Sequence, residues 1–232
     1  MENKKEEKTN LDLDAALVGT TQKAEEFYNK YKKQINISLA AIAIIVVGYI
    51  SFNMFYIEPK EKEAQAAIFK AQLWFEKDSF ETALNGMGDA LGFEAIASEY
   101  ALTKAGNLAH FYAGRCLMEL GKYEEAIDHL NDFSTNNELI APLAEGLKAD
   151  AYVELGNLEK AAKLYIKAAN MSKNKLTSPI FLKKAGQVFE ELKEYQDAVK
   201  AYENIKTNYF ESQEAQDIDR YIARAKTLAN QN

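Results

Sequence analysis

The sequence predicts an all-α protein, in which a single N-terminal transmembrane helix precedes an α-solenoid of helix pairs and a C-terminal capping helix. The first observation is composition, because 232 residues with only 3 Pro and 11 Gly, rich in Ala, Leu, Glu and Lys, favour helix. The second is one long uncharged apolar run near the N-terminus. The third is a helical pattern of small and apolar residues that recurs after 35 and 37 residues.

Composition also narrows the class of function. A hydrophobic content of 47% with 27% charged residues is typical of a chain that builds a packed core. The net charge of −7 disfavours nucleic acid as a partner, since phosphates are repelled. The single cysteine, Cys116, excludes an intramolecular disulfide, and His110 and His129 leave little material for a catalytic or metal site. We therefore expect no enzymatic activity, no cofactor and no metal.

The uncharged run extends from Ile35 to Ile57. As a helix it would span roughly 35 Å, enough to cross a hydrocarbon core with some tilt. A buried helix of a soluble domain is the alternative, which the sharp charged borders disfavour. The run is long for a cleaved signal peptide and no Ala-x-Ala pattern follows it, so we predict an uncleaved signal anchor with one crossing. Pro59 is expected to end the helix.

The flanks of this segment predict its orientation. Lys30, Lys32 and Lys33 precede it, whereas the residues after it are of mixed charge. The positive-inside rule therefore places the N-terminus in the cytoplasm and residues 58–232 outside. Residues 1 to about 20 are expected to be unstructured, and a juxtamembrane helix is expected over Thr21–Gln34, with acidic side chains at its start and basic ones at its end.

Three stretches outside the membrane share one pattern: residues 114–126, 149–161 and 186–198. Each begins with a small residue. Counted from that residue, an apolar residue follows at position +3, Leu at +6, an aromatic residue or Leu at +9, and Ala at +12. The small residue would let two antiparallel helices approach closely, and the Ala would mark where the second helix touches the first. The small residues are Gly114, Ala149 and Gly186, and the alanines are Ala126, Ala161 and Ala198.

This pattern resembles the tetratricopeptide repeat, which implies a stack of antiparallel helix pairs. Gly121 and Gly156 fall in the turn between the helices, where glycine readily adopts positive φ. Lys193 replaces that glycine in the third copy, so its turn is expected to be tighter or shifted. Pro142 and Pro179 fall near the first position of a repeat, where a helix tolerates proline.

A weaker copy precedes these three, with Ala71 and Ala83 at the small positions and about nine extra residues after it. The insertion includes Asn85–Gly92, which we interpret as a helix–helix loop. The last segment, about Ser212 to Ala229, is one amphipathic helix that would cover the final apolar face. The predicted divisions are 1–34 (cytoplasmic tail), 35–57 (membrane anchor), 58–106 (degenerate repeat with insertion), 107–141, 142–178 and 179–211 (repeats) and 212–232 (capping helix).

In a stack of such pairs the first helix of each pair lines the concave side. We expect this groove to hold an extended or helical peptide, and it is richest in apolar residues near Phe69, Phe111 and Met118. The alternative is that some of these side chains pack against the inserted segment. The candidate protein-binding residues are Phe69, Leu108, Phe111, Arg115, Met118, Asp150, Val153, Lys183 and Gln187.

Within the membrane segment, Ala41 and Gly48 are candidates for a close-packing face, because they are small and lie seven residues apart. The alternative is that this helix is a simple anchor. Just before it, Ala24–Lys33 places acidic residues, an aromatic pair and then basic residues ahead of the apolar helix.

This layout and segment resemble the YfgM family of bacterial inner-membrane proteins. The resemblance implies a single-pass inner-membrane protein with a cytoplasmic N-terminus and a periplasmic repeat domain. It implies the SecYEG translocon and the membrane-anchored chaperone PpiD as partners, and a non-enzymatic role as a scaffold or chaperone for newly exported proteins. The alternative is a scaffold in another envelope complex for outer-membrane biogenesis, secretion or division.

Overall fold

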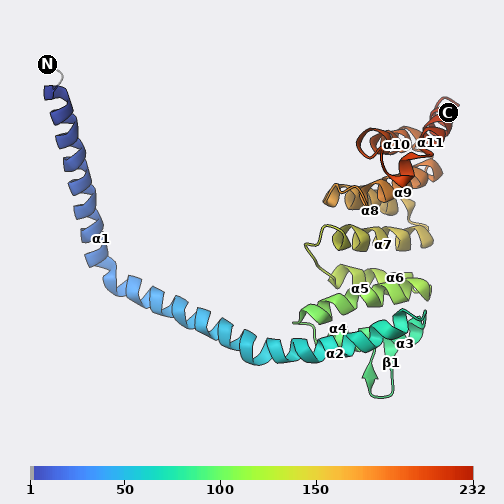
Figure 1. Ribbon diagram of the computed structural model, residues 1–232, viewed down its shortest axis with the longest axis horizontal. Coiled ribbons are helices and arrows are strands. Elements are labelled where there is room, and N and C mark those ends of the chain that lie inside the picture. The colour runs from blue at the N-terminus through green and yellow to red at the C-terminus, as the bar shows by residue number, and fades with distance from the viewer. Residues whose placement is uncertain (1–2, 232) are drawn as a thin grey trace. The chain divides into compact units, whose positions relative to one another are not determined.

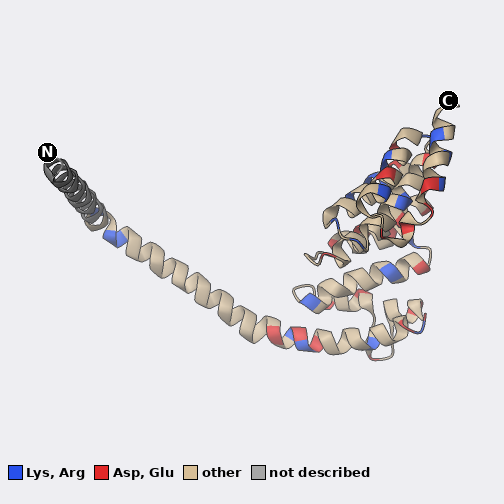
Figure 2. Ribbon diagram, turned by 45° about the horizontal axis from the view of Figure 1, so that its top comes forward, with Lys and Arg blue, Asp and Glu red and all other residues tan. Residues whose placement is uncertain are grey.

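In the N-terminal unit of the protein, Met1–Glu58, residues 3–58 are helical (Figure 1). The structure is a computed structural model that describes the backbone of residues 3–231 and the side chains of residues 28–231. Helix α1 covers Asn3–Phe52 and continues into one π-helical segment, η1 (Asn53–Ile57). The helical stretch Tyr28–Phe75 includes a window with a mean hydropathy of 2.3 and no buried residue, which suits a membrane span by length and composition. Figure 2 shows a long tan section of the ribbon, without charged residues, between the basic residues near the start of this stretch and the charged residues at the start of α2.

Two predictions for this unit are corrected. Helix α1 begins at Asn3, where an unstructured start was expected; no Gly or Pro interrupts the good helix formers before Gly19. Pro59 does not end the helix, because helix α2 (Glu58–Phe75) follows η1 directly. A proline ring collides with the carbonyl four residues earlier in a regular α-helix, and the wider π turn, in which Glu58 N–H bonds the Asn53 carbonyl, makes room for it.

The second unit, Pro59–Asn232, is a stack of antiparallel helix pairs (Figure 1). From α4 onward each helix packs mainly on its neighbours in sequence, as expected for a solenoid. Its buried apolar side chains form two clusters, one in the earlier and one in the later pairs. After α2 come α3 (Phe80–Asn85), α4 (Phe93–Glu99), α5 (Lys104–Glu119), α6 (Tyr123–Asp132), α7 (Ile140–Glu154), α8 (Leu158–Met171), α9 (Ser178–Glu191), α10 (Tyr195–Asn208), the 3₁₀ turn η2 (Gln213–Ala215) and α11 (Ile218–Ala229).

The small residues of the pattern lie where the two helices of a pair meet. A Cβ added to Gly114 would come within 2.7 Å of Leu130, and one added to Gly186 within 2.2 Å of Tyr202. The three alanines on the second helices are completely buried. Close helix–helix approach therefore requires these small side chains, as the sequence predicted. These alanines are Ala126, Ala161 and Ala198.

All four helix pairs turn in the same way. Gly121 and Gly156 have φ of 72° and 74°, and Asp78 and Lys193 adopt the same left-handed conformation at 56° and 62°. The expected shift of the turn at Lys193 is therefore wrong. The Lys193 N–H bonds the Glu190 carbonyl and the next N–H reaches back to Phe189, the same two hydrogen bonds that close the glycine turns. These bonds hold a lysine in a conformation that glycine adopts more readily.

The inserted segment forms more than a loop. A two-stranded antiparallel hairpin, β1 (Gly86–Met87) and β2 (Ala90–Leu91), leads into helix α4. Phe93 at the start of α4 is buried, and its ring stacks on Tyr112 of α5 at 5.0 Å. The insertion therefore covers α5. A separate contact joins α2 to the start of α5, where the Glu61 carboxylate accepts a hydrogen bond from the backbone N–H of Lys104 at 2.6 Å.

Candidate protein-binding surface

Most of the predicted groove residues occupy equivalent positions on the first helices of successive pairs. Counted back from the turn residue, Arg115, Asp150 and Gln187 share one position. Phe69 does not belong to this series. It aligns with Tyr112 of α5, which faces the preceding part of the stack and contacts Phe75 and Phe93. The structure therefore separates Phe69 from the other predicted residues.

The region around Phe111 and Met118 is filled largely by side chains of the protein itself. The Arg115 guanidinium lies 4.8 Å from the centre of the Phe75 ring. The Phe111 ring lies 5.2 Å from that of Phe133 at the end of α6. Leu108 and Met118 pack against the earlier core cluster. The part of the groove expected to be richest in apolar residues therefore makes several contacts within the protein, and its role in binding stays a prediction.

Asp150 joins three helices. The hydroxyl of Tyr165 in α8 donates to its carboxylate, and Lys184 Nζ of α9 lies 2.6 Å from Oδ1. Burial raises the pKa of Tyr165, and the neighbouring Asp150 charge raises it further, so the phenol keeps its proton. Val153, one turn further along α7, packs against the later core cluster. Asp150 is therefore engaged in linking consecutive pairs.

Glu190 has the same role one pair later. Its Oε1 accepts the hydroxyl of Tyr202 in α10 at 3.0 Å, and Arg224 of α11 lies 2.8 Å from its Oε2. Burial first, and then the Glu190 charge, raise the pKa of Tyr202. The ion pair with Glu190 raises the pKa of Arg224. These contacts fix α9 against α10 and the capping helix.

The exposed side of α9 borders three hollows of about 560, 290 and 580 Å³. The first two share Ile180 and Glu214, and the last two share Gln187, so the hollows follow one another along the helix. The segment after α10 and helix α11 form the opposite wall. We call this surface the α9 groove and define it by Leu176, Ile180, Lys183, Gln187, Phe210 and Glu214.

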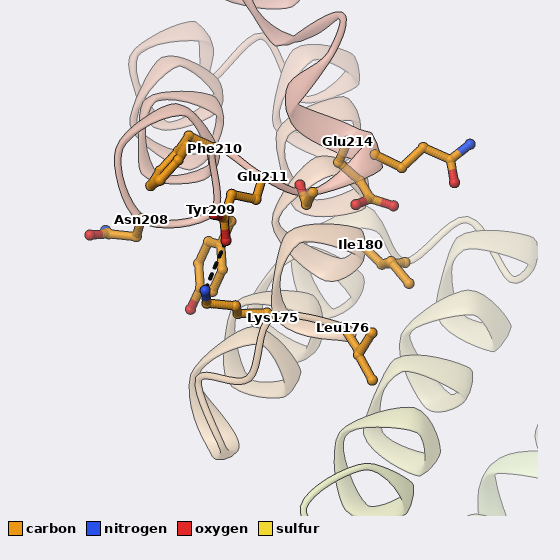
Figure 3. Close-up of a pocket in the computed structure, with 10 residues that line it drawn as sticks. Lys175, Leu176, Ile180, Asn208, Tyr209, Phe210, Glu211 and Glu214 are labelled. Carbon is orange, nitrogen blue, oxygen red and sulfur yellow. Dashed lines mark hydrogen bonds and ion pairs between the residues drawn. The ribbon is translucent and has the colours of Figure 1, made fainter.

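The first of these hollows, of about 560 Å³, lies at the beginning of α9 (Figure 3). Leu176 lies in the loop before α9, and Ile180 lies in the first turn of α9. Phe210 comes from the segment after α10. The side chains of Leu176 and Phe210 are 66% and 70% exposed. An ion pair between Lys175 and Glu211, at 2.9 Å, joins the two walls. The hollow thus combines exposed apolar side chains with a fixed polar rim.

Sequence reasoning found Lys183 and Gln187 but missed the apolar residues of the α9 groove. Ile180 could have been found, because it stands at the same distance from the turn as Leu108, a residue that the sequence did select. Leu176 and Phe210 lie in connecting segments, where no helical period marks them. The wall that they form depends on how α9 and α10 are connected to their neighbours.

The chemically reactive side chains lie apart from this groove. His110 Nδ1 and His129 Nδ1 are 3.1 Å apart, and burial, followed by the charge of His129, lowers the pKa of His110. Cys116 is fully buried, and burial raises the pKa of its thiol to about 12. Within the part of the chain that the structure describes, no three His, Cys, Asp or Glu side chains are grouped to hold a metal ion.

Ala41 and Gly48 lie two helical turns apart on α1 and are exposed. A Cβ added to Gly48 would meet no atom within 4 Å. The structure therefore leaves room for a close neighbour beside this helix, and the packing role of Ala41 and Gly48 stays a prediction.

Comparisons with known proteins agree with this geometry. Residues 108–137 and 147–209 match two tetratricopeptide-repeat family models. The TPR-like repeats of a Podosopora anserina kinesin light chain superpose with a TM-score of 0.56 at 15% identity, over 74% of this chain and 89% of that one. MamA superposes with a TM-score of 0.52 at 15% identity, over 72% of this chain and 92% of that one. No curated protein matches the sequence.

At 15% identity these structures establish the fold alone, and the family models establish the repeat type. The helix pairs within residues 108–137 and 147–209 are tetratricopeptide repeats. The repeat unit is therefore a scaffold for protein–protein interaction.

Proposed function

We propose that the protein is a membrane-anchored scaffold whose α9 groove holds a peptide segment of a partner protein. The observation that carries this proposal is the run of three hollows along α9, which share lining residues from one to the next. An exposed apolar cluster with a polar rim is typical of a recognition site. Leu176, Ile180 and Phe210 would bury an apolar side chain of the peptide, and Lys183 and Gln187 would contact its polar groups.

The anchor in this proposal is the uncharged part of α1, residues 35–57. Its length and mean hydropathy support a single crossing, and the lysines before it support a cytoplasmic N-terminus. The repeat unit then acts on the outer side, in the periplasm of a bacterial inner membrane. A membrane-impermeant maleimide should label Leu102→Cys from outside in intact cells, but should label Asn29→Cys only after the membrane is opened. Labelling of both positions in intact cells would contradict this topology.

For the partner we propose the SecYEG translocon, with a membrane-anchored chaperone such as PpiD, so that the scaffold assists newly exported proteins. The support is the likeness in layout and in Ala24–Lys33 to the YfgM family. A scaffold of another envelope complex is the competing proposal. The two differ in the membrane complex that accompanies the protein.

The test is purification of the tagged full chain in a gentle detergent, followed by mass spectrometry of the proteins that accompany it. We expect translocon subunits with the wild type. Ile180→Asp and Phe210→Asp should lose the peptide-bearing partner, whereas Leu102→Asp, which changes an exposed leucine outside the groove, should retain it. Envelope proteins without translocon subunits would contradict the partner, and equal recovery with all variants would contradict the α9 groove.

A further inference from the structure

The two histidines of the chain face each other across one helix pair. His110 belongs to α5 and His129 to α6, and their Nδ1 atoms are 3.1 Å apart. Their ring centres are 5.2 Å apart. Two nitrogen lone pairs repel each other at this distance unless a hydrogen lies between them. One ring therefore donates its Nδ1–H and the other ring accepts it.

The packing of α5 against α6 holds the two rings together. One turn before His110, the Asn107 side chain accepts the Ser134 N–H at 3.0 Å and donates to the Ser134 carbonyl at 2.8 Å. One turn after His110, Gly114 lets the helices approach closely, since a Cβ there would come within 2.7 Å of Leu130. The two imidazoles lie between these contacts, so the helices present the two nitrogens at a fixed separation.

The surroundings of the pair suit a cation that arrives from solvent. Both histidines are partly exposed, so water and dissolved ions can reach them. Burial, followed by the charge of His129, lowers the pKa of His110, which favours the neutral imidazole with a free lone pair. The charge of Asp132, at the end of α6, opposes this shift and therefore acts on the same place. A negative charge beside the pair would attract a cation.

We propose that His110 and His129 form a binding site for a divalent transition-metal ion of the Cu(II) or Zn(II) type, with their Nδ1 atoms as the protein ligands. Metal–nitrogen bonds of about 2.0–2.1 Å place two ligands of one ion about 2.9 Å apart at a right angle and about 3.4 Å apart at the tetrahedral angle. The observed 3.1 Å lies between these values. The ion replaces the shared hydrogen, which moves to Nε2 of its own ring, so no net proton is released.

The ligand set predicts reversible binding. Imidazole suits copper, zinc and nickel, and affinity is highest for Cu(II). Within the described residues no third His, Cys, Asp or Glu joins the pair, so water fills the other positions around the ion. An ion held by both rings links α5 to α6 and stabilises the folded pair, because the unfolded chain does not hold the two nitrogens together. This proposal replaces the expectation of no metal, which rested only on the number of histidines.

The test uses the full chain in detergent, with a tag that contains no histidine, stripped of metal by a chelator and titrated with Cu(II) alone. Electron paramagnetic resonance should show imidazole nitrogens bound to one copper ion per chain. His110→Asn and His129→Asn remove one imidazole each, and each should weaken Cu(II) binding at least tenfold. Glu125→Gln, which removes an exposed carboxylate from α6, is the matched control and should bind as the wild type does. Undiminished binding by both histidine variants would overturn the proposal.

Thermal unfolding, followed by circular dichroism, separates loss of the ligand from damage to the fold. Zn(II) should raise the unfolding midpoint of the wild type by several degrees and leave those of His110→Asn and His129→Asn unchanged. An equal rise in all three proteins would mean that the ion binds elsewhere and would contradict the proposal. If a variant is already unfolded without metal, the wild-type spectrum still decides, because the chain has no other imidazole. A wild-type spectrum without imidazole nitrogens would rule the site out.

Discussion

Tyr165 and Tyr202 occupy the same position of successive repeats, and each hydroxyl donates to a carboxylate on the first helix of its own pair. A cation from the helix that follows the pair completes each link, Lys184 of α9 in the first and Arg224 of the capping helix α11 in the second. Measured from the turn residue of its own pair, Asp150 lies about one helical turn further back than Glu190. Both carboxylates nevertheless link the same kinds of helices. Neighbouring pairs are thus joined through polar links as well as apolar packing. The links are Asp150–Tyr165–Lys184 and Glu190–Tyr202–Arg224.

Tyr202→Phe should lower the free energy of unfolding by about 1–2 kcal/mol, because a hydrogen bond to a largely buried carboxylate is lost while the ring stays in place. Urea unfolding of the purified full chain, followed by circular dichroism, measures the change. Tyr195→Phe is the matched control on the same helix, since the described structure records no hydrogen bond of its hydroxyl. Equal effects of the two substitutions would show that the link to Glu190 contributes nothing.

Lys193→Gly should raise the free energy of unfolding by up to about 1 kcal/mol. Lys193 has φ of 62°, a left-handed conformation that costs a residue with a Cβ roughly 1–2 kcal/mol. Glycine avoids this cost, but it also gives the unfolded chain more conformational freedom, which offsets part of the gain in stability. The reciprocal change, Gly121→Ala, should lower stability by a similar amount. An alanine Cβ at Gly121 would meet no atom within 4 Å, so only the backbone conformation is tested. Destabilisation by Lys193→Gly would refute this account.

The helix pairs could be predicted from the sequence because their packing depends on local spacing. Gly114 and Ala126 stand a fixed number of residues apart, and that spacing determines which side chains meet between two antiparallel helices. The turn at Lys193 could not be predicted from the residue type. Its conformation is set by the hydrogen bonds from the Lys193 and Glu194 N–H groups to carbonyls at the end of α9. These bonds form in the turn of every helix pair, whatever residue stands there.

The candidate site was only partly accessible to sequence reasoning. Lys183 and Gln187 follow from the helical period, but Phe210 lies in a connecting segment whose path depends on η2 and α11. Asp150 was selected as a groove residue from its position, whereas its bonds to Tyr165 and Lys184 come from helices 15 and 34 residues away. Contacts of this kind depend on tertiary structure and leave no pattern in a single helix.

Gly146→Ala should lower the free energy of unfolding by about 1–3 kcal/mol, although alanine is the better helix former by about 1 kcal/mol. A Cβ at Gly146 would come within 2.0 Å of the Phe181 ring, which is buried and cannot move aside. Phe181→Leu removes the atoms that clash. In a double-mutant cycle by urea unfolding, the double variant should therefore lose less than the sum of the two single variants. Strict additivity would contradict the steric explanation.

The stability of the protein should fall in acid partly through Glu145, a buried carboxylate of α7. Lys167 Nζ lies 2.6 Å and Lys148 Nζ 2.9 Å from its oxygens. Burial by itself would raise the Glu145 pKa, but the two ammonium groups outweigh it and hold the pKa below its usual value. The unfolded chain then binds a proton at higher pH than the folded protein does. The contribution is complete above the usual glutamate pKa of about 4.3 and is lost as pH falls through the lowered pKa.

Urea unfolding of the wild type and of Glu145→Gln at a series of pH values from 7 to 3 tests this expectation. The wild type should be the more stable at neutral pH, and its advantage should shrink below about pH 4.3. Glu125→Gln is the control, because Glu125 is mostly exposed and lies 3.9 Å from Lys122, so its removal should change little at any pH. A stability difference between wild type and Glu145→Gln that stays constant across the series would show that the two lysines do not stabilise the ionised form.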